Sequence, residues 1–183
     1  MVRTSLLRPA FELLVQYARY HRDRRNITTH LIGVPLIVFA VGVLLARGVV
    51  ELAGVRTSLA WVAFGVLALW MLTRGLPALA VATAAFVGAL VWAAHGLGDG
   101  ALLSWLGWGL GLFVLGWCIQ LMGHYYEGRK PASADDLIGL LVGPMFVVLE
   151  FLAMAGFCRP LVARIEHSAG PTMLRDLAQP LSR

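Results

Sequence analysis

Five apolar runs joined by short polar connections set the pattern of this chain. Most approach the about 20 residues that a helix needs to cross a bilayer, and the second run is short. The pattern predicts an all-α, polytopic transmembrane helical bundle of about five spans, forming a single integral membrane domain over residues 1–183. The runs cover residues 27–46, 59–72, 76–94, 101–123 and 137–157.

The chain before the first run follows a different pattern. Pro9 suits a helix start, and apolar side chains then recur every three or four residues towards His21. This spacing predicts an N-terminal amphipathic helix lying at the membrane interface. The next segment, RDRRN, is too polar to be buried, and Asn26 suits the N-cap of a helix that begins at Ile27.

Small residues and prolines add detail to the later spans. Glycines at positions 107, 109, 111 and 116 predict close helix packing. Residues 133–136 resemble a capping box, which would open the last helix. Pro144 predicts that this helix is kinked or divided, and a divided helix would make the last segment re-entrant.

The basic residues bear on orientation, because cytoplasmic loops carry an excess of lysine and arginine. Five crossings from a cytoplasmic N-terminus put Arg74 and the basic pair at 129–130 inside, but they leave the C-terminal arginines outside. A re-entrant last segment would return the tail to the cytoplasm. Under both topologies His21, His30 and His124 lie at the same face of the membrane, so they can meet.

Composition supports a membrane location. The chain is 59% hydrophobic and 14% charged, with a mean hydropathy of +0.77, whereas soluble domains average about a quarter charged residues. The net charge is +5, but the arginines border apolar runs, which favours lipid headgroups over nucleic acid as their partners. We expect a protein of the bacterial inner (cytoplasmic) membrane that contacts membrane lipids, with its polar site at the cytoplasmic face.

Polar side chains that could bind a metal or catalyse a reaction gather where the fourth run ends. Gln120, His124 and Glu127 are spaced i, i+4 and i+7, so a continuous helix carries them as one polar stripe. Polar groups are unfavourable against lipid, which predicts an inward-facing cluster with His21 and His30. Three imidazoles and a carboxylate suit Fe(II), with zinc as a competitor.

Simpler interpretations remain open at this stage. Each histidine could contact a headgroup, and Glu127 could pair with Arg74 or the basic residues at 129–130. Tyr17 is expected in the interfacial aromatic belt. Glu150 lies inside the last run, where it is either a functional group or the buried partner of another helix. The two remaining histidines, His95 and His167, lie outside the cluster.

Two stretches, YHRDRRNITTHLIGVP at 20–35 and QLMGHYYEGRKPA at 120–132, resemble the membrane 2-hydroxy fatty acid dioxygenase family of fatty-acid α-oxidation. The shared pattern is His, Asn and His leading into Gly-Val-Pro, then Gln-x-x-Gly-His with a glutamate, ending in Arg-Lys-Pro-Ala. The segment GPMFVVLE around Glu150 adds a less specific match. The resemblance implies an Fe(II)-dependent enzyme that uses dioxygen to shorten a 2-hydroxy fatty acid by one carbon.

The resemblance also implies roles for residues of this chain. His21, His30 and His124 are the expected iron ligands, and Glu127 is a fourth ligand or orients a histidine. Further residues are expected to bind the substrate or to support the metal ligands through hydrogen bonds. The expected substrate-binding residues are Arg25, Asn26, Arg129 and Lys130, and the expected supporting residues are Gln120 and Glu150.

Two alternatives come from other classes of function. A zinc-dependent membrane lipid hydrolase would use Glu127 to activate a metal-bound water. A non-catalytic membrane protein would use the polar cluster only to hold its helices together. Oxygen dependence separates the dioxygenase from the first alternative, and folding without metal favours the second.

Overall fold

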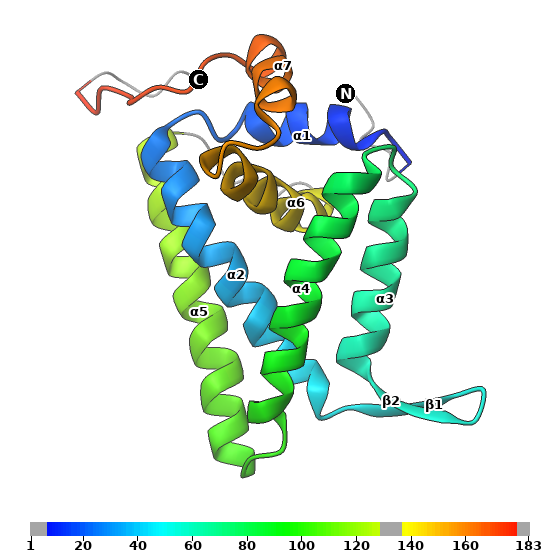
Figure 1. Cartoon of the computed structure of the whole chain (residues 1–183). Helices are drawn as coiled ribbons and strands as arrows, with labels where there is room; N and C mark the ends of the chain where they lie inside the picture. Colours follow the sequence, from blue (N-terminus) through cyan, green and yellow to red (C-terminus); the bar gives the residue numbers. More distant parts are fainter. Residues whose placement is uncertain (1–6, 129–136, 179–183) are drawn as a thin grey trace.

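The computed structural model describes residues 7–128 and 137–178, and most of them are helical (Figure 1). The prediction of a helical bundle is therefore confirmed, with one exception between the first two long helices. The elements are α1 (Ala10–Ala18), α2 (Arg24–Ala46), β1 (Val49–Leu52), β2 (Val55–Ser58), α3 (Leu59–Leu72), α4 (Pro77–Gly98), α5 (Leu102–Glu127), α6 (Leu137–Met154) and α7 (Arg159–Ala169).

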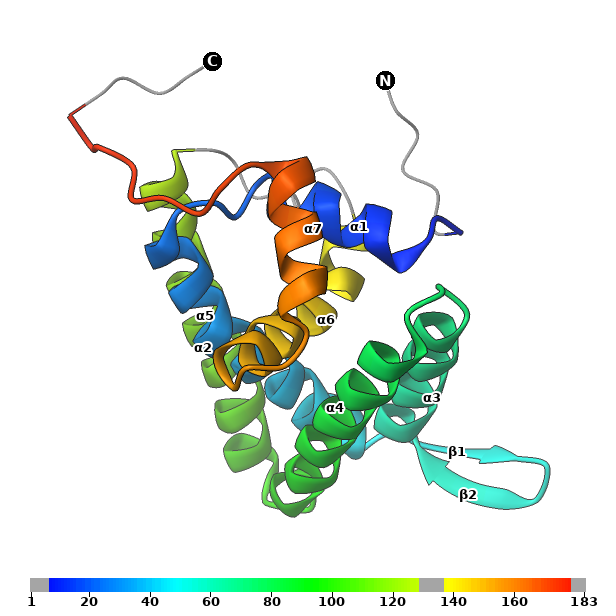
Figure 2. The same cartoon turned by 45° about the horizontal axis from the view of Figure 1, so that its top comes forward.

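The exception is an antiparallel hairpin of β1 and β2, which the prediction of an all-α chain missed. Its strands contain β-branched residues, and they flank a turn at Ala53 and Gly54 in which both residues have positive φ. Two such residues match the twist of antiparallel strands. The hairpin is mostly exposed and lies at one end of the bundle, away from α1 and α7 (Figures 1 and 2).

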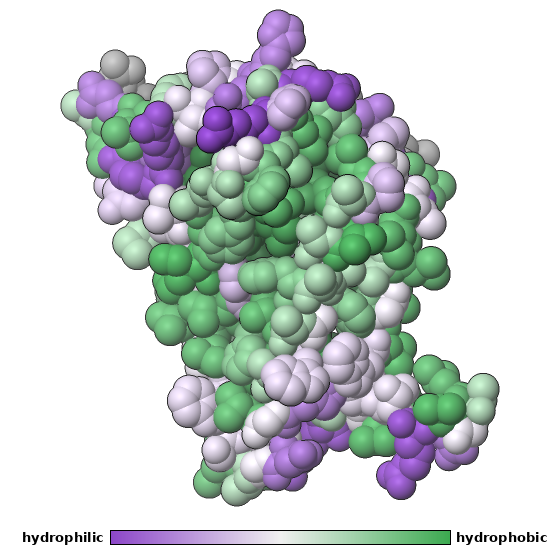
Figure 3. Space-filling view, viewed as in Figure 1, coloured by the Kyte–Doolittle hydropathy of each residue, from purple (hydrophilic) through white to green (hydrophobic). Residues whose placement is uncertain are grey.

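Among the described residues, α2, α4 and α5 are long and apolar enough to cross a membrane, while α3 and the described part of α6 are shorter. An apolar belt surrounds the middle of the face in Figure 3, and hydrophilic residues gather at its two ends. These features indicate an integral membrane protein. Pro144 does not divide α6, which is one continuous helix running crosswise to the long helices (Figures 1 and 2).

Glycines bring α2 and α5 close together along their length. A Cβ on Gly116 would lie 2.7 Å from Ile37 Cγ1 and 3.0 Å from the Gly33 carbonyl oxygen, and a Cβ on Gly109 would overlap Leu44. The prediction of close packing is confirmed at these two positions. It is wrong at Gly107 and Gly111, where a Cβ would meet nothing within 4 Å.

We expect Gly116→Ala to lower the thermal stability of the detergent-solubilised protein, because the added methyl must push α2 away at a backbone contact. Overpacking of this kind costs about 1–3 kcal/mol. Gly111→Ala is the matched control on the same helix. Alanine has a higher helix propensity than glycine, so this variant should leave the free energy of unfolding unchanged or raise it by up to about 1 kcal/mol. Equal melting temperatures for the two variants would contradict the close contact.

The start of α2 differs from the sequence prediction. Its N-cap is Asp23, whose side chain accepts a hydrogen bond from the Arg25 backbone N–H, and the helix begins at Arg24 rather than Ile27. Asn26 is fully buried within the first turn. The prediction that RDRRN is too polar to be buried is also wrong for Arg22 and Asp23, which are buried with hydrogen-bonding partners, whereas Arg24 is exposed.

The C-terminal segment explains how this loop is buried. The backbone of Met173 donates to the Arg22 carbonyl and accepts from the Arg24 N–H, both at 2.9 Å. Arg175 N–H donates to Asp23 at 2.8 Å, and α7 packs against α1 at the same end of the bundle (Figure 2). The basic tail thus lies at the N-terminal end, as the re-entrant alternative for the last segment requires. The possible capping box at 133–136 lies outside the described residues.

Candidate metal centre

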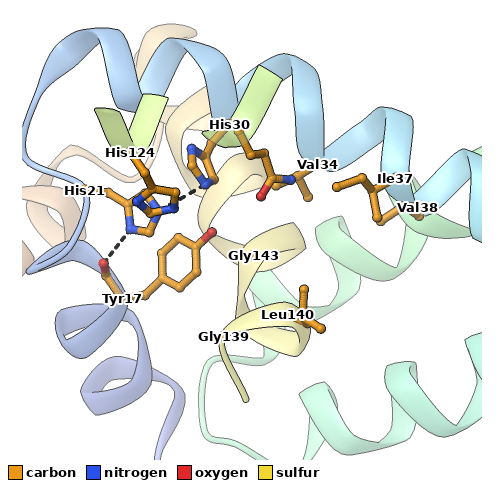
Figure 4. A pocket seen from close by; sticks show the side chains of 11 residues that line it. Tyr17, His21, His30, Val34, Ile37, Val38, His124, Gly139, Leu140 and Gly143 are labelled. Atoms are coloured by element: carbon orange, nitrogen blue, oxygen red, sulfur yellow. Dashed lines mark hydrogen bonds between the residues drawn. The ribbon is translucent and has the colours of Figure 1, made fainter. Parts of the chain in front are cut away.

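Three buried imidazoles converge where α2 and α5 meet the loop that follows α1. His21 lies in that loop, His30 on the second turn of α2, and His124 near the end of α5. Their ring centroids are 4.3 to 5.1 Å apart, and one nitrogen from each lies within 4.8 Å of the other two (Figure 4). The prediction that these histidines meet is confirmed.

Hydrogen bonds decide which nitrogens of two rings face the centre. Nδ1 of His21 lies 2.7 Å from the Tyr17 carbonyl oxygen, and Nδ1 of His30 lies 2.9 Å from the Asn26 carbonyl oxygen. A carbonyl only accepts, so each Nδ1 carries a hydrogen and each neutral ring presents a lone pair at Nε2. The two Nε2 atoms face each other at 3.1 Å. Two lone pairs at this distance repel unless a cation lies beside them.

The remaining donors also fit a metal ion. Nδ1 of His124 is buried and has no hydrogen-bonding partner among the described residues. Burial, followed by the nearby His30 ring, lowers the pKa of His21 well below its ordinary value. The imidazole therefore stays neutral, which is the form that binds metal. Three neutral imidazoles suit several divalent ions, including iron and zinc, so the donor set gives a metal class rather than one element.

Glu127 lies beside this group but is engaged elsewhere. Its carboxylate accepts from the backbone N–H of Arg22 at 3.0 Å, from that of Asp23 at 2.8 Å and from Asn26 Nδ2 at 3.1 Å. The histidine group that could hold a metal does not include it. In this arrangement Glu127 fixes the backbone that carries His21, which corresponds to the second of its two predicted roles.

Asn26 and Arg25 are held by protein groups rather than free at a substrate cleft. The Asn26 amide donates to Glu127 and to the Tyr20 carbonyl, while its buried Oδ1 has no partner among the described residues. Arg25 pairs with Asp23 at 2.7 Å and stacks on the Tyr126 ring. Hydrogen bonds from Arg25 and Arg175 outweigh the opposing effect of burial and lower the pKa of Asp23.

The other predicted residues occupy three different settings. Gln120 is buried in the wall of the histidine pocket. Glu150 lies on α6, where its electrostatic neighbours are Arg22 and Glu166 rather than the three imidazoles. The expected substrate residues Arg129 and Lys130 lie outside the described residues.

Tyr17 is the residue that the sequence interpretation misplaced. It is buried, not in an interfacial belt, and its ring stacks on His21 with 4.1 Å between centroids. Figure 4 shows its hydroxyl pointing into the pocket, and a Cβ on Gly143 would approach that oxygen to 3.4 Å. Burial raises the pKa of Tyr17, so the phenol remains a hydrogen-bond donor. Its spacing of four residues before His21 was the available signal.

The pocket beside the imidazoles is small, with a volume of about 40 Å³. Polar groups from Tyr17, Gln120 and the histidines occupy one end. The remaining wall is aliphatic and comes from α2 and α6 (Figure 4). A small polar group attached to an apolar chain fits this division between polar and apolar walls.

Sequence comparisons place most of the chain in one known family. The profile of the Mpo1-like family, described as 2-hydroxy-palmitic acid dioxygenase Mpo1-like, matches residues 7–155. The chain belongs to this family. It is 33% identical over 155 residues to the 2-hydroxy-palmitic acid dioxygenase MPO1 of Saccharomyces cerevisiae, covering 82% of this chain and 84% of the yeast protein. No solved structure matches. The family resemblance seen in the sequence is confirmed.

Proposed function

We propose that this protein is an Fe(II)-dependent dioxygenase that shortens 2-hydroxy fatty acids by one carbon. The observation that carries the proposal is the facing pair of Nε2 lone pairs on His21 and His30, with His124 beside them, in a member of a 2-hydroxy-palmitic acid dioxygenase family. Fe(II) held by these nitrogens would supply reactivity towards dioxygen and a Lewis acid for the hydroxyl and carboxylate of the substrate.

The protein groups around the metal have separate tasks in this proposal. The Tyr17 and Asn26 carbonyls hold the tautomers of His21 and His30, which directs the Nε2 lone pairs inwards. Glu127 holds the loop of His21 in place. The Tyr17 hydroxyl is placed to donate to an oxygen of the bound head group. The aliphatic wall excludes water from the reacting end.

We also propose a topology in which α2 to α5 cross the membrane and the continuous helix α6 lies crosswise between them, in place of a fifth complete crossing. Four crossings leave α1, α7 and the histidines at one face. Arginines are concentrated in the segments at that end, which makes it the cytoplasmic face under the positive-inside rule. The site then lies at the boundary between headgroups and acyl chains.

The proposal is tested by anaerobic reconstitution of purified protein with Fe(II), followed by dioxygen and 2-hydroxyhexadecanoic acid. We expect pentadecanoic acid in the mass spectrum, with no product when iron or oxygen is omitted. Reconstitution with Zn(II) is the matched control. Release of fatty acid from an ester lipid by the zinc-loaded protein without oxygen, with no shortened acid from the iron-loaded protein, would favour a lipid hydrolase. A folded protein that binds neither metal would favour a purely structural cluster.

A further inference from the structure

An apolar groove continues from the histidine pocket into the middle of the bundle. Its volume is about 250 Å³, and side chains from α2, α3, α4, α5 and α6 line it. Ile37, Val38 and Leu140 line both the histidine pocket and the groove, so the two spaces share a boundary. A small polar pocket and a larger apolar groove thus lie side by side.

The helix spacing shows how far the groove reaches. Trp117 and Phe113 line the groove on α5. Both precede His124 on the same helix. At the helical rise per residue they lie about 10 Å and about 16 Å along the axis from His124. One leaflet of a bilayer is about 15 Å deep in its hydrocarbon region. The groove is therefore matched to the length of one fatty acyl chain.

We infer that this groove binds the alkyl chain of the 2-hydroxy fatty acid, with the carboxylate and hydroxyl at the histidines and the chain end near Phe113 and the start of α3. The inference rests on the proposed function and adds to it a binding site that selects chain length. The groove walls are almost entirely apolar, so the methylenes of a chain placed there face no unpaired polar group.

The polar end decides between a free fatty acid and a bilayer lipid as the occupant. The pocket at the histidines offers about 40 Å³, which suits a carboxylate and a hydroxyl but not a phosphodiester headgroup with a second acyl chain. The groove is partly open along α3, where Ala63 is exposed. A single chain dissolved in the bilayer can enter sideways there without passing through water.

Blocking the far part of the groove tests chain selection. Ala63 lines the groove in the second turn of α3, at the end remote from the histidines, and because it is exposed a larger side chain there meets little core. Ala63→Trp should lower kcat/KM for 2-hydroxyhexadecanoic acid at least about tenfold, because the indole fills the space of the chain end and overpacks the groove. Turnover of 2-hydroxyoctanoic acid should not change.

The matched control is Val66→Trp on the same helix. Val66 is 67% exposed and does not line the groove, so its tryptophan should leave the chain-length profile as in the wild type. An unchanged profile in Ala63→Trp, or an equal loss for both acids in both tryptophan variants, would overturn the assignment.

Photolabelling separates this inference from the proposed function. The probe is 2-hydroxyhexadecanoic acid with a diazirine at its chain end, added to wild-type protein in phosphatidylcholine nanodiscs. We expect labelled peptides from 59–72 and 102–117, displaced by excess 2-hydroxyhexadecanoic acid. Groove labelling without turnover would keep the binding site and refute the dioxygenase. Turnover with labelling elsewhere, or groove labelling that excess 2-hydroxyhexadecanoic acid does not reduce, would refute the binding site alone.

Discussion

His124→Ala is expected to abolish high-affinity metal binding and turnover while leaving the protein folded and inserted in the membrane. The variant removes one of three converging nitrogens and leaves the hydrogen bonds of His21 and His30 intact. Two remaining imidazoles cannot complete a three-histidine site. Nδ1 of the lost ring makes no hydrogen bond to the described part of the chain, so the variant loses packing but no hydrogen bond from that atom there.

Metal content after dialysis, measured by mass spectrometry, is the primary readout for His124→Ala, and size-exclusion behaviour in detergent reports the fold. His167→Ala is the matched control, because this exposed histidine lies on α7 at the same end of the bundle. We expect wild-type iron content in the control. Retention of one iron per protein and normal turnover in His124→Ala would refute the metal centre.

Glu127→Gln is expected to weaken metal binding about 10- to 100-fold, the usual cost of disturbing groups that orient metal ligands. The carboxylate accepts hydrogen bonds from two backbone N–H groups and an amide. Glutamine keeps the shape but turns an N–H₂ towards one of these donors. An unsatisfied buried donor costs about 1–3 kcal/mol, so the free energy of unfolding should also fall.

Metal titration distinguishes positioning from ligation in Glu127→Gln. A positioning residue predicts a raised Kd with the same stoichiometry at saturating Fe(II), together with a lower melting temperature. A lost stoichiometry at unchanged melting temperature would make Glu127 a ligand instead. Glu12→Gln is the matched control on α1, where the half-exposed carboxylate pairs with Arg8 and a change should have little effect.

Much of the architecture was accessible because its causes are local. Apolar runs of spanning length predict membrane helices wherever they occur, and glycines at one helical spacing allow close approach, as Gly116 shows. The meeting of His21, His30 and His124 followed from counting crossings, which puts segments far apart in sequence at one membrane face. The i, i+4, i+7 spacing added that Gln120, His124 and Glu127 share one side of α5.

Other features depend on partners that no local pattern names. RDRRN is polar in composition, yet Arg22, Asp23 and Asn26 are buried. Glu127, Met173 and Arg175 supply hydrogen bonds to this segment from more than 100 residues away. Tyr17 has the amphipathic character of a belt residue. Only the packing of α1 across the bundle turns its ring onto His21.

By itself, the sequence determined that this is a helical membrane protein of a 2-hydroxy fatty acid dioxygenase family with three histidines at one face. How those residues are arranged depends on the tertiary structure. It placed the Nε2 atoms of His21 and His30 face to face, assigned Glu127 to the backbone of the loop, and opened an apolar groove beside the pocket. The physical reason is that hydrogen-bond satisfaction and cavity shape depend on distances between elements, whereas hydrophobic spacing depends only on neighbours in the chain.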